Sequence, residues 1–292
     1  MTRQKMLTRA TPYLFILPCA ILVFIVLLYP VSAGIVKSLY NENLLIPAPV
    51  KFVGVQNFGA LFSDPLFLGA LHRSIVWTLV ILVFEMIFGM FFALFLNANI
   101  YCKKLLRCLI LIPWVIPNAI SGIIWKWFLN ESYGFLNYLL RSMRFIEHNL
   151  PWLSNNELAA ISVVCIIIWK NIPFVTITLL AGLQSISPDL YEAARVDGAG
   201  FLTTFFRITM PMISSIILIT GILTSIWNFN QLDIIQVVTR GGPGVATLSM
   251  PIFIYRLFME SFQTSYASSA AVVMMIIMTI PTVIYVRKLL KR

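Results

Sequence analysis

Polar side chains interrupt an otherwise apolar segment around residue 225. They recur at spacings of three, one and three residues: Thr224, Trp227, Asn228 and Gln231. In a helix these spacings place all four on one face. Amide groups bond hydroxyls and an indole ring covers the apolar face of a sugar ring, but polar side chains also bond one another between helices. The cluster therefore predicts contact with a hydroxylated solute, with helix-to-helix hydrogen bonding as the alternative.

Charged residues are rare in the apolar segments, which contain Glu85 and Lys170. A charge at the centre of a membrane helix costs roughly 2.5–3.5 kcal/mol on insertion scales, so each needs a compensating partner. Lys170 is suited to donate to solute hydroxyls or to attract a phosphate or uronate. It is equally suited to an ion pair with Glu85, and the residues alone leave both interpretations open.

Residues 181–211 have the pattern of a structured loop. Ser187 is a suitable N-cap and Pro188 fits the first helical position. A helix over 188–197 would be about 15 Å long, whereas a bilayer core is about 30 Å thick. Gly198 is a natural C-terminal stop. The pattern thus predicts a short helix that does not span.

The same short helix carries small residues on one face. Glu192 and Arg195 are three residues apart and can pair. The shared face consists of Leu190, Ala193, Ala194 and Asp197. Small side chains on an exposed helix let another surface approach closely, so this helix is predicted to dock a partner. An ordinary connecting loop is the alternative, and a second short helix is predicted over 201–209.

The residue patterns of common active sites do not occur in the sequence. His72 and His148 lie outside the apolar segments, and the four cysteines match no metal-site spacing. No G-x-x-x-x-G-K-[ST] phosphate-binding loop occurs. We therefore expect no catalytic residue, no metal site and no cofactor in this chain, and we do not expect an enzyme.

The segments that carry these residues are predicted to be transmembrane helices. Of the 292 residues, 60% are hydrophobic and 11% are charged, whereas soluble domains are about 25% charged. Six windows reach the roughly 20 apolar residues that a span needs: Tyr13–Ile35, Ile75–Leu96, Cys108–Trp125, Leu158–Leu180, Met212–Leu232 and Ala267–Val286. No strand-like alternation of a membrane barrel occurs. The predicted fold is an all-α integral membrane protein with six transmembrane helices.

The net charge of +10 is distributed as membrane topology requires. Twelve basic residues fall in the tails and loops of one side and eight in the longer loops of the other. The denser basic side is cytosolic, so both termini are predicted inside and no nucleic-acid role is expected. The predicted parts are a cytosolic tail (1–12), a first transmembrane helix (13–35), an outer loop (36–74), a five-helix core (75–286) with the cytosolic loop 181–211, and a cytosolic tail (287–292).

The cytosolic loop also carries a specific motif. Residues 192–211 read EAARVDGAGFLTTFFRITMP and resemble the EAA loop of ABC importer permeases, with Met210 where Leu is usual. Three further stretches resemble the maltose-type family of permeases for oligosaccharides and glycerol phosphates: 111–137, 169–200 and 228–244. The resemblance covers roughly Phe52 to the C-terminus. It implies the type I ABC importer permease fold, in which the short helix is the coupling helix.

The resemblance implies a division of labour among subunits. Two homologous permease chains pair around one pathway, two ATP-binding subunits hold ATP and Mg and dock on the EAA loops, and an extracytoplasmic solute-binding protein delivers a carbohydrate. The implied coupling residues are Glu192, Ala193, Ala194, Asp197 and Gly198. The implied location is the lipid bilayer of a bacterial or archaeal cell (inner) membrane.

The resemblance also implies where the solute passes. The positions that match the family's sugar-lining stretches are Asn118, Lys170, Asn171, Phe174, Thr224, Trp227, Asn228 and Gln231. An ion-coupled secondary transporter of a small polar solute is the alternative function. Such folds favour internal repeats and intramembrane carboxylates, whereas no repeat is evident here and Glu85 is the single carboxylate inside a window.

The predicted topology determines which loops a membrane-impermeant thiol reagent reaches. In a variant without the natural cysteines, a cysteine at Asn43, Asn149 or Thr247 should react in intact cells because these positions fall in outer loops. A cysteine at Ser187 should react only after the cells are permeabilised. Labelling at Ser187 in intact cells would reverse the topology.

Overall fold

The computed structural model describes residues 15–45 and 49–290, which are helical without β-strands apart from one isolated bridge between Tyr40 and Phe52. The predicted cytosolic tail at 1–12 lies outside the described residues. The chain forms two compact units: unit 1 contains residues 1–68 and 254–277, and unit 2 contains residues 69–253 and 278–292. Each unit is described by itself.

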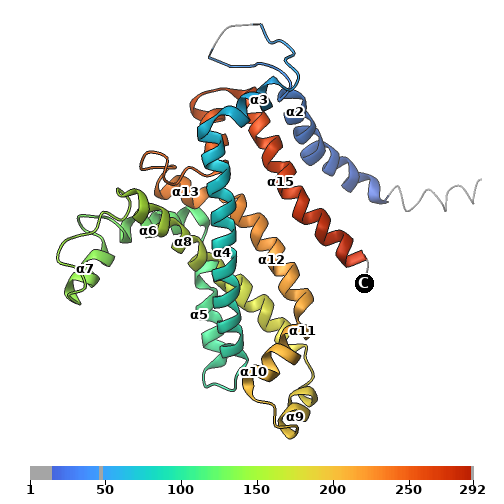
Figure 1. Ribbon diagram of the computed structural model, residues 1–292, viewed down its shortest axis with the longest axis vertical. Coiled ribbons are helices and arrows are strands. Elements are labelled where there is room, and N and C mark those ends of the chain that lie inside the picture. The colour runs from blue at the N-terminus through green and yellow to red at the C-terminus, as the bar shows by residue number, and fades with distance from the viewer. Residues whose placement is uncertain (1–14, 46–48, 291–292) are drawn as a thin grey trace, which may run out of the picture. The chain divides into compact units, whose positions relative to one another are not determined.

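The helices follow one another along the chain, with the longest connections at 38–55, 143–155 and 239–249 (Figure 1). They are η1 (Phe24–Leu28), α2 (Tyr29–Lys37), α3 (Gln56–Ser63), α4 (Pro65–Asn97), α5 (Lys103–Val115), α6 (Asn118–Phe128), α7 (Phe135–Ser142), α8 (Asn156–Gln184), α9 (Pro188–Val196), α10 (Phe201–Thr204), η2 (Phe205–Thr209), α11 (Met210–Met212), α12 (Ser214–Phe229), α13 (Asp233–Val238), α14 (Met250–Tyr255), η3 (Arg256–Glu260) and α15 (Thr264–Leu290). Elements marked η are π-helical turns.

The described residues contain five or six candidate spans, where the sequence predicts six. Five segments are long and apolar enough to cross a bilayer: Phe15–Lys37, Pro65–Asn97, Asn156–Gln184, Ser214–Val238 and Thr264–Val283. The pair α5 and α6, which is bent by 93°, makes a sixth where it is counted as one span. The prediction of an all-α membrane fold is confirmed, and the segment predicted as the third span is bent rather than straight.

The break in the third span follows from its prolines. The sequence predicted one helix over Cys108–Trp125, but α5 ends before Ile116, whose backbone is extended with ψ 131°. A proline disfavours helical geometry in the residue before it, and Pro117 follows Ile116 directly. Pro117 is itself extended, with ψ 143°, and α6 begins after it in a new direction.

Two further boundaries differ from the prediction. α4 begins at Pro65, so most of the last part of the expected outer loop 36–74 is helical. α12 stops at Phe229 and α13 restarts at Asp233. Gln231 therefore lies in the link between two helices and does not share a helical face with Thr224, which corrects the predicted four-residue face.

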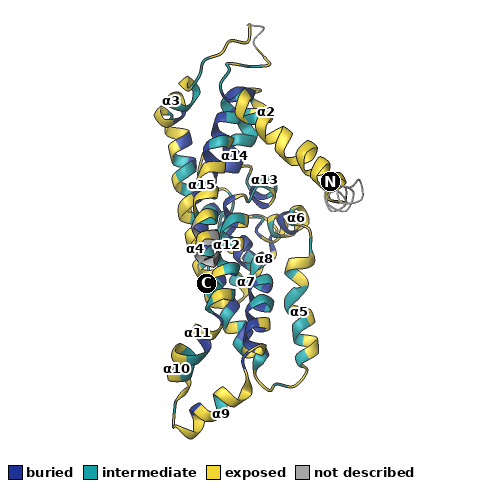
Figure 2. Cartoon of the chain, turned by 90° about the vertical axis from the view of Figure 1, so that its right-hand side faces the viewer, coloured by how far each residue is buried: buried dark blue, intermediate teal, exposed yellow. Residues whose placement is uncertain are grey.

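α8 is the central helix of unit 2 and has a long buried face (Figure 2). α4 approaches it closely at Gly89, where an added Cβ would lie 2.4 Å from Val175 Cγ1. On the other side, a Cβ at Gly182 would lie 2.7 Å from Ile216 Cδ1 of α12. Lipid tails are as apolar as leucine, so helices in a bilayer associate through such close packing rather than through the hydrophobic effect.

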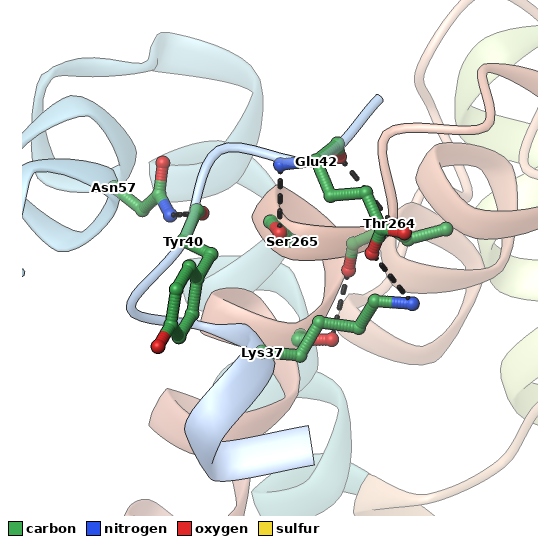
Figure 3. Close-up of polar contacts among 7 residues, drawn as sticks. Lys37, Tyr40, Glu42, Asn57, Thr264 and Ser265 are labelled. Atoms are coloured by element: carbon green, nitrogen blue, oxygen red, sulfur yellow. Dashed lines mark hydrogen bonds and ion pairs between the residues drawn. The ribbon is translucent and has the colours of Figure 1, made fainter. Parts of the chain in front are cut away.

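Unit 1 contains a polar cluster at the C-terminal end of the first span (Figure 3). Lys37 Nζ lies 2.7 Å from Glu42 Oε2, and the Glu42 N–H donates to Ser265 Oγ at 2.9 Å. Thr264 Oγ1 donates to the same carboxylate at 3.1 Å. The hydrogen bond from Lys37 is the main cause that lowers the pKa of Glu42. These contacts join the chain after α2 to the first turn of α15.

The first span itself is exposed along its whole length within unit 1, because no residue of the most apolar part of Phe15–Lys37 is buried (Figure 2). A helix satisfies its own backbone groups, so such a span is stable in lipid without packing on its own chain.

One labelling position of the sequence analysis needs correction. Thr247 is fully buried and bonds Thr239 Oγ1 at 2.7 Å, so a thiol there would not be accessible. Val245, in the same loop, is 44% exposed and is the better position.

Candidate functional site: a docking helix and a polar centre between the spans

The docking helix α9 forms as its sequence predicts, to within one residue at its end. Ser187 has extended backbone and Pro188 begins the helix, but Ser187 Oγ bonds Asp189 Oδ2 at 3.1 Å instead of capping a backbone N–H. After the helix, Gly198 has a φ of +74°, a left-handed conformation that residues with a Cβ rarely adopt. The turn therefore requires glycine.

Exposure divides the five predicted coupling residues. Glu192, Ala193, Asp197 and Gly198 are exposed. Ala194 is buried and packs within the chain instead of facing outward. The predicted pair of Glu192 with Arg195 is not among the ion pairs of the described residues. Glu192 is thus free to meet a group outside this chain.

Several apolar side chains near α9 are exposed and were missed by the sequence reasoning. They are Val196, Phe201, Leu202 and Phe206, and Val196 is 88% exposed. Their signal was available, because FLTTFF is an apolar run in a segment assigned to water. A contiguous apolar surface beside a docking helix is typical of a protein interface.

A cavity of about 750 Å³ lies between α9 and the C-terminal end of α4. Asn97 of α4 lines it from one side, and Tyr191 and Arg195 of α9 from the other. The Tyr191 hydroxyl lies 3.2 Å from Thr209 Oγ1, which joins α9 to η2. Both residues of this hydrogen bond also line the cavity, so the cavity borders the contact that holds α9.

Lys170 lies at the break of the third span, where it is 4% exposed. Its ammonium donates to the carbonyl oxygens of Pro113 and Trp114 at 2.8 Å each and to that of Ile116. The Pro113 carbonyl would bond the N–H four residues on, but that residue is Pro117, which has none.

This geometry answers the question that the sequence left open for Lys170. An ammonium has three N–H donors, and all three are used by the carbonyls. The structure therefore shows neither the ion pair with Glu85 nor a donor free for a solute. Lys170 supplies the hydrogen bonds that the end of α5 cannot make itself.

Glu85, Asn171 and Asn228 form a second polar group, which joins α4, α8 and α12. Asn228 Nδ2 donates to Glu85 Oε2 at 2.9 Å, and Asn171 Nδ2 donates to Asn228 Oδ1 at 2.9 Å. Glu85 is fully buried and Asn228 is 7% exposed, while the buried Glu85 Oε1 has no hydrogen-bond partner. In this arrangement Asn228 acts between helices, which is the alternative stated for it above.

Three aromatic rings from three helices form a row in the same region. The ring centroids of Trp114 and Phe174 are 5.9 Å apart, and those of Phe174 and Trp227 are 4.7 Å apart. Trp114 and Trp227 are 45% and 41% exposed. Trp114 is a site residue that sequence reasoning missed, because an indole in an apolar window has no periodic signal of its own.

The remaining predicted path residues lie in different surroundings. Asn118 Nδ2 donates to Asp233 Oδ2 at 3.3 Å, which joins the start of α6 to the start of α13. Gln231 is half-buried. Thr224 is fully buried, and its hydroxyl donates to the Thr220 carbonyl at 2.9 Å. Among the described residues, no group of three or more His, Cys, Asp or Glu side chains is placed to hold a metal.

The contacts of Lys170 make a prediction about stability. Lys170→Met keeps the apolar stem but leaves three backbone carbonyls without their donor, each at a cost of about 1–3 kcal/mol where water does not reach. We expect the thermal midpoint of the purified protein to fall and less protein to be inserted. Lys170→Arg retains donors and should lose less. A Met variant as stable as the parent would show that the carbonyls have other partners.

Comparisons with known proteins place the chain in a family. Residues 85–292 match the family described as "Binding-protein-dependent transport system inner membrane component". The sulfoquinovosyl glycerol transport system permease protein SmoG of Agrobacterium fabrum is 32% identical over 279 residues, 96% of this chain and 90% of that protein. The trehalose/maltose transport system permease protein MalF of Thermococcus litoralis is 36% identical over 246 residues, 84% of this chain and 82% of that protein.

A solved structure has the same fold. A chain of a bacterial ABC transporter involved in the import of the acidic polysaccharide alginate matches with a TM-score of 0.81 and 24% identity, over 97% of this chain and 98% of the other. The family match extends over more than half of the sequence. It includes the helix α9, the polar group of Glu85, Asn171 and Asn228, and the row of three aromatic rings. The chain therefore belongs to the family of inner membrane components of binding-protein-dependent transport systems.

Proposed function

We propose that this chain is the transmembrane permease subunit of an ATP-driven, binding-protein-dependent importer of a sugar or oligosaccharide, and that it forms half of the pathway. The observation that carries the proposal is the row of Trp114, Phe174 and Trp227. Exposed aromatic rings inside a membrane protein, with amide side chains nearby, suit a molecule that has apolar ring faces and many hydroxyls. The names of the relatives from Agrobacterium and Thermococcus, which include sugars, support the same class of solute.

We assign the path to those members of the predicted set that are exposed or half-buried. Trp227 and Phe174 cover sugar rings, with Trp114 added to them, and Gln231 and Asn118 bond hydroxyls. Thr224, Lys170 and Asn228 make their hydrogen bonds within the chain. Asn171 has one amide N–H committed to Asn228 and is half-buried, so it stands at the edge of the path.

Energy reaches the path through α9. Exposed Glu192 makes the charged contact with an ATP-binding subunit, Ala193 allows close approach, and Gly198 makes the turn that Asp197 precedes. The exposed Val196 and Phe201 enlarge the contact, while Ala194 fixes α9 to its own chain. The cavity behind α9 gives the helix room to shift when the ATPase changes shape.

The full assembly comprises a second homologous permease, two ATP-binding subunits that hold ATP and Mg, and an extracytoplasmic solute-binding protein. Both termini lie in the cytosol of a bacterial or archaeal cell. A secondary transporter is disfavoured by the family match. The carboxylate of Glu85 on α4 accepts a hydrogen bond from Asn228 and is fully buried.

The coupling role predicts the effect of reversing one charge. Glu192 is exposed and unpaired within the described chain, so Glu192→Arg should leave insertion unchanged. In a docking cleft that accepts a carboxylate, the reversal places two positive charges next to each other, often at a cost of 2–5 kcal/mol. We expect loss of ATPase co-purification and of uptake. Glu147→Arg, the same change at an exposed outer position, is the control, and normal uptake by the Glu192 variant would contradict the role.

The aromatic row predicts a separation between transport and stability. Trp227→Ala and Gln231→Leu should each lower uptake into vesicles by about tenfold, because a hydrogen bond or ring contact is worth about 0.5–1.5 kcal/mol. Protein yield should remain unchanged, as for Phe91→Ala, which truncates an exposed ring on α4. Asn228→Leu, by contrast, should lower yield because Glu85 loses its donor. Unchanged uptake by both variants would show that Trp227 and Gln231 do not contact the solute.

A further inference from the structure

The segment between α6 and α8 has an inverted distribution of polarity. Its centre is Asn137 of α7, which is 1% exposed. Asn137 Nδ2 donates to the carbonyls of Glu131 and Leu150, and Oδ1 accepts from the Leu150 N–H and from Trp152 Nε1 at 2.9 Å. This amide uses both its donor and acceptor sides and fixes the loop around a polar interior.

The outside of the same segment is aromatic. Its exposed apolar side chains are Trp127, Tyr133, Phe135, Tyr138, Met143 and Phe145, and we name this surface the outer shelf. Tyr138 and Phe145 are 70% and 73% exposed, far more than the polar Asn137. A fold that buries an amide and exposes aromatic rings is stable only if something other than water covers the rings.

The outer shelf is continuous with a stripe of α6. Ile120, Ile123 and Trp127 are exposed and lie on one helical face at spacings of three and four. The opposite face packs on α13, where a Cβ at Gly122 would lie 3.0 Å from Val237. The rings of Trp127 and Tyr133 are 5.8 Å apart, so the stripe runs on into the shelf without a gap. The shelf thus continues an apolar face that belongs to a spanning segment.

A hollow of about 650 Å³ opens among these rings. Trp127, Tyr133 and Tyr138 line it together with Arg141, which lies one helical turn after Tyr138 and is exposed. Neither acid of the segment, Glu131 or Glu147, lines the hollow. Aromatic rings with a guanidinium at their edge match the boundary between acyl chains and phosphate groups, where tyrosine, tryptophan and arginine anchor membrane proteins.

We propose that the outer shelf lies in the membrane–water boundary of the outer leaflet and binds phospholipid there, with the phosphate at Arg141 and the glycerol and upper acyl chains against Tyr138 and Trp127. This role goes beyond the proposed transport function and does not depend on the solute. A surface for the solute-binding protein would be released after each delivery and would need a more polar composition. The shelf fixes the depth of α6 in the bilayer.

The access of oxygen and of a nickel chelate to a spin label shows whether the labelled position lies in lipid or in water. In the purified complex in lipid nanodiscs, with the four natural cysteines replaced, a label at Tyr138→Cys should collide readily with oxygen and poorly with a water-soluble nickel chelate. His148→Cys, exposed in the same loop, is the matched control and should show the reverse. High nickel access at position 138 would overturn the proposal. Low access to both reagents would also overturn it, because a protein surface would then cover the shelf.

Two further arms separate phospholipid from its rivals. Arg141→Glu should raise nickel access at position 138 by about fivefold in nanodiscs with one quarter phosphatidylglycerol, whereas Arg141→Lys should not. Equal nickel access at position 138 in the two variants would show that Arg141 does not bind a lipid phosphate. If the loaded binding protein shields the position 138 label, the shelf is a protein-docking surface and the lipid assignment is wrong.

Discussion

The three carbonyl oxygens at the end of α5 must find donors in a region without water, and Lys170 is where they find them. In lipid, a free backbone group costs several kcal/mol, which is why unbroken helices are the rule. Here the break is retained because a side chain from α8 replaces the missing helical bonds. The positive charge is compensated by the negative end of the α5 dipole rather than by a carboxylate. The same contact therefore gives the backbone carbonyls their hydrogen bonds and stabilises the charge of the Lys170 ammonium.

Further polar and aromatic contacts between the helices of unit 2 depend on this bend. Because α6 leaves α5 at 93°, Asn118 reaches Asp233 of α13, and Trp114 lies at the turn, where it stacks on Phe174. The neighbouring group of Glu85, Asn171 and Asn228 ties three helices around that row. The polar residues described here thus form two groups: those whose hydrogen bonds join helices, and those that remain exposed or half-buried.

Much of this architecture follows from local sequence patterns. Span number, the helix after Pro188 and the need for Gly198 rest on hydrophobicity, caps and φ, which are properties of a few adjacent residues. Lys170 could not be interpreted from sequence because its partners lie 54 to 57 residues away and are backbone atoms, which carry no sequence signal. Gln231 was wrongly placed on the helical face of Thr224, because periodicity cannot show that α12 stops at Phe229. Ala193 and Ala194 look alike in a motif, and only packing separates the exposed one from the buried one.

The distance along the chain between Lys170 and the break has a consequence for biosynthesis. A ribosome that has just released α5 has not yet made α8, so the carbonyls of Pro113, Trp114 and Ile116 face the translocation channel without their donor. α5 has 13 residues, about 20 Å, which is short for a membrane crossing of about 30 Å. The third segment is therefore a poor substrate for insertion alone. Its insertion is therefore favoured when the fourth segment, which carries Lys170, enters the bilayer with it.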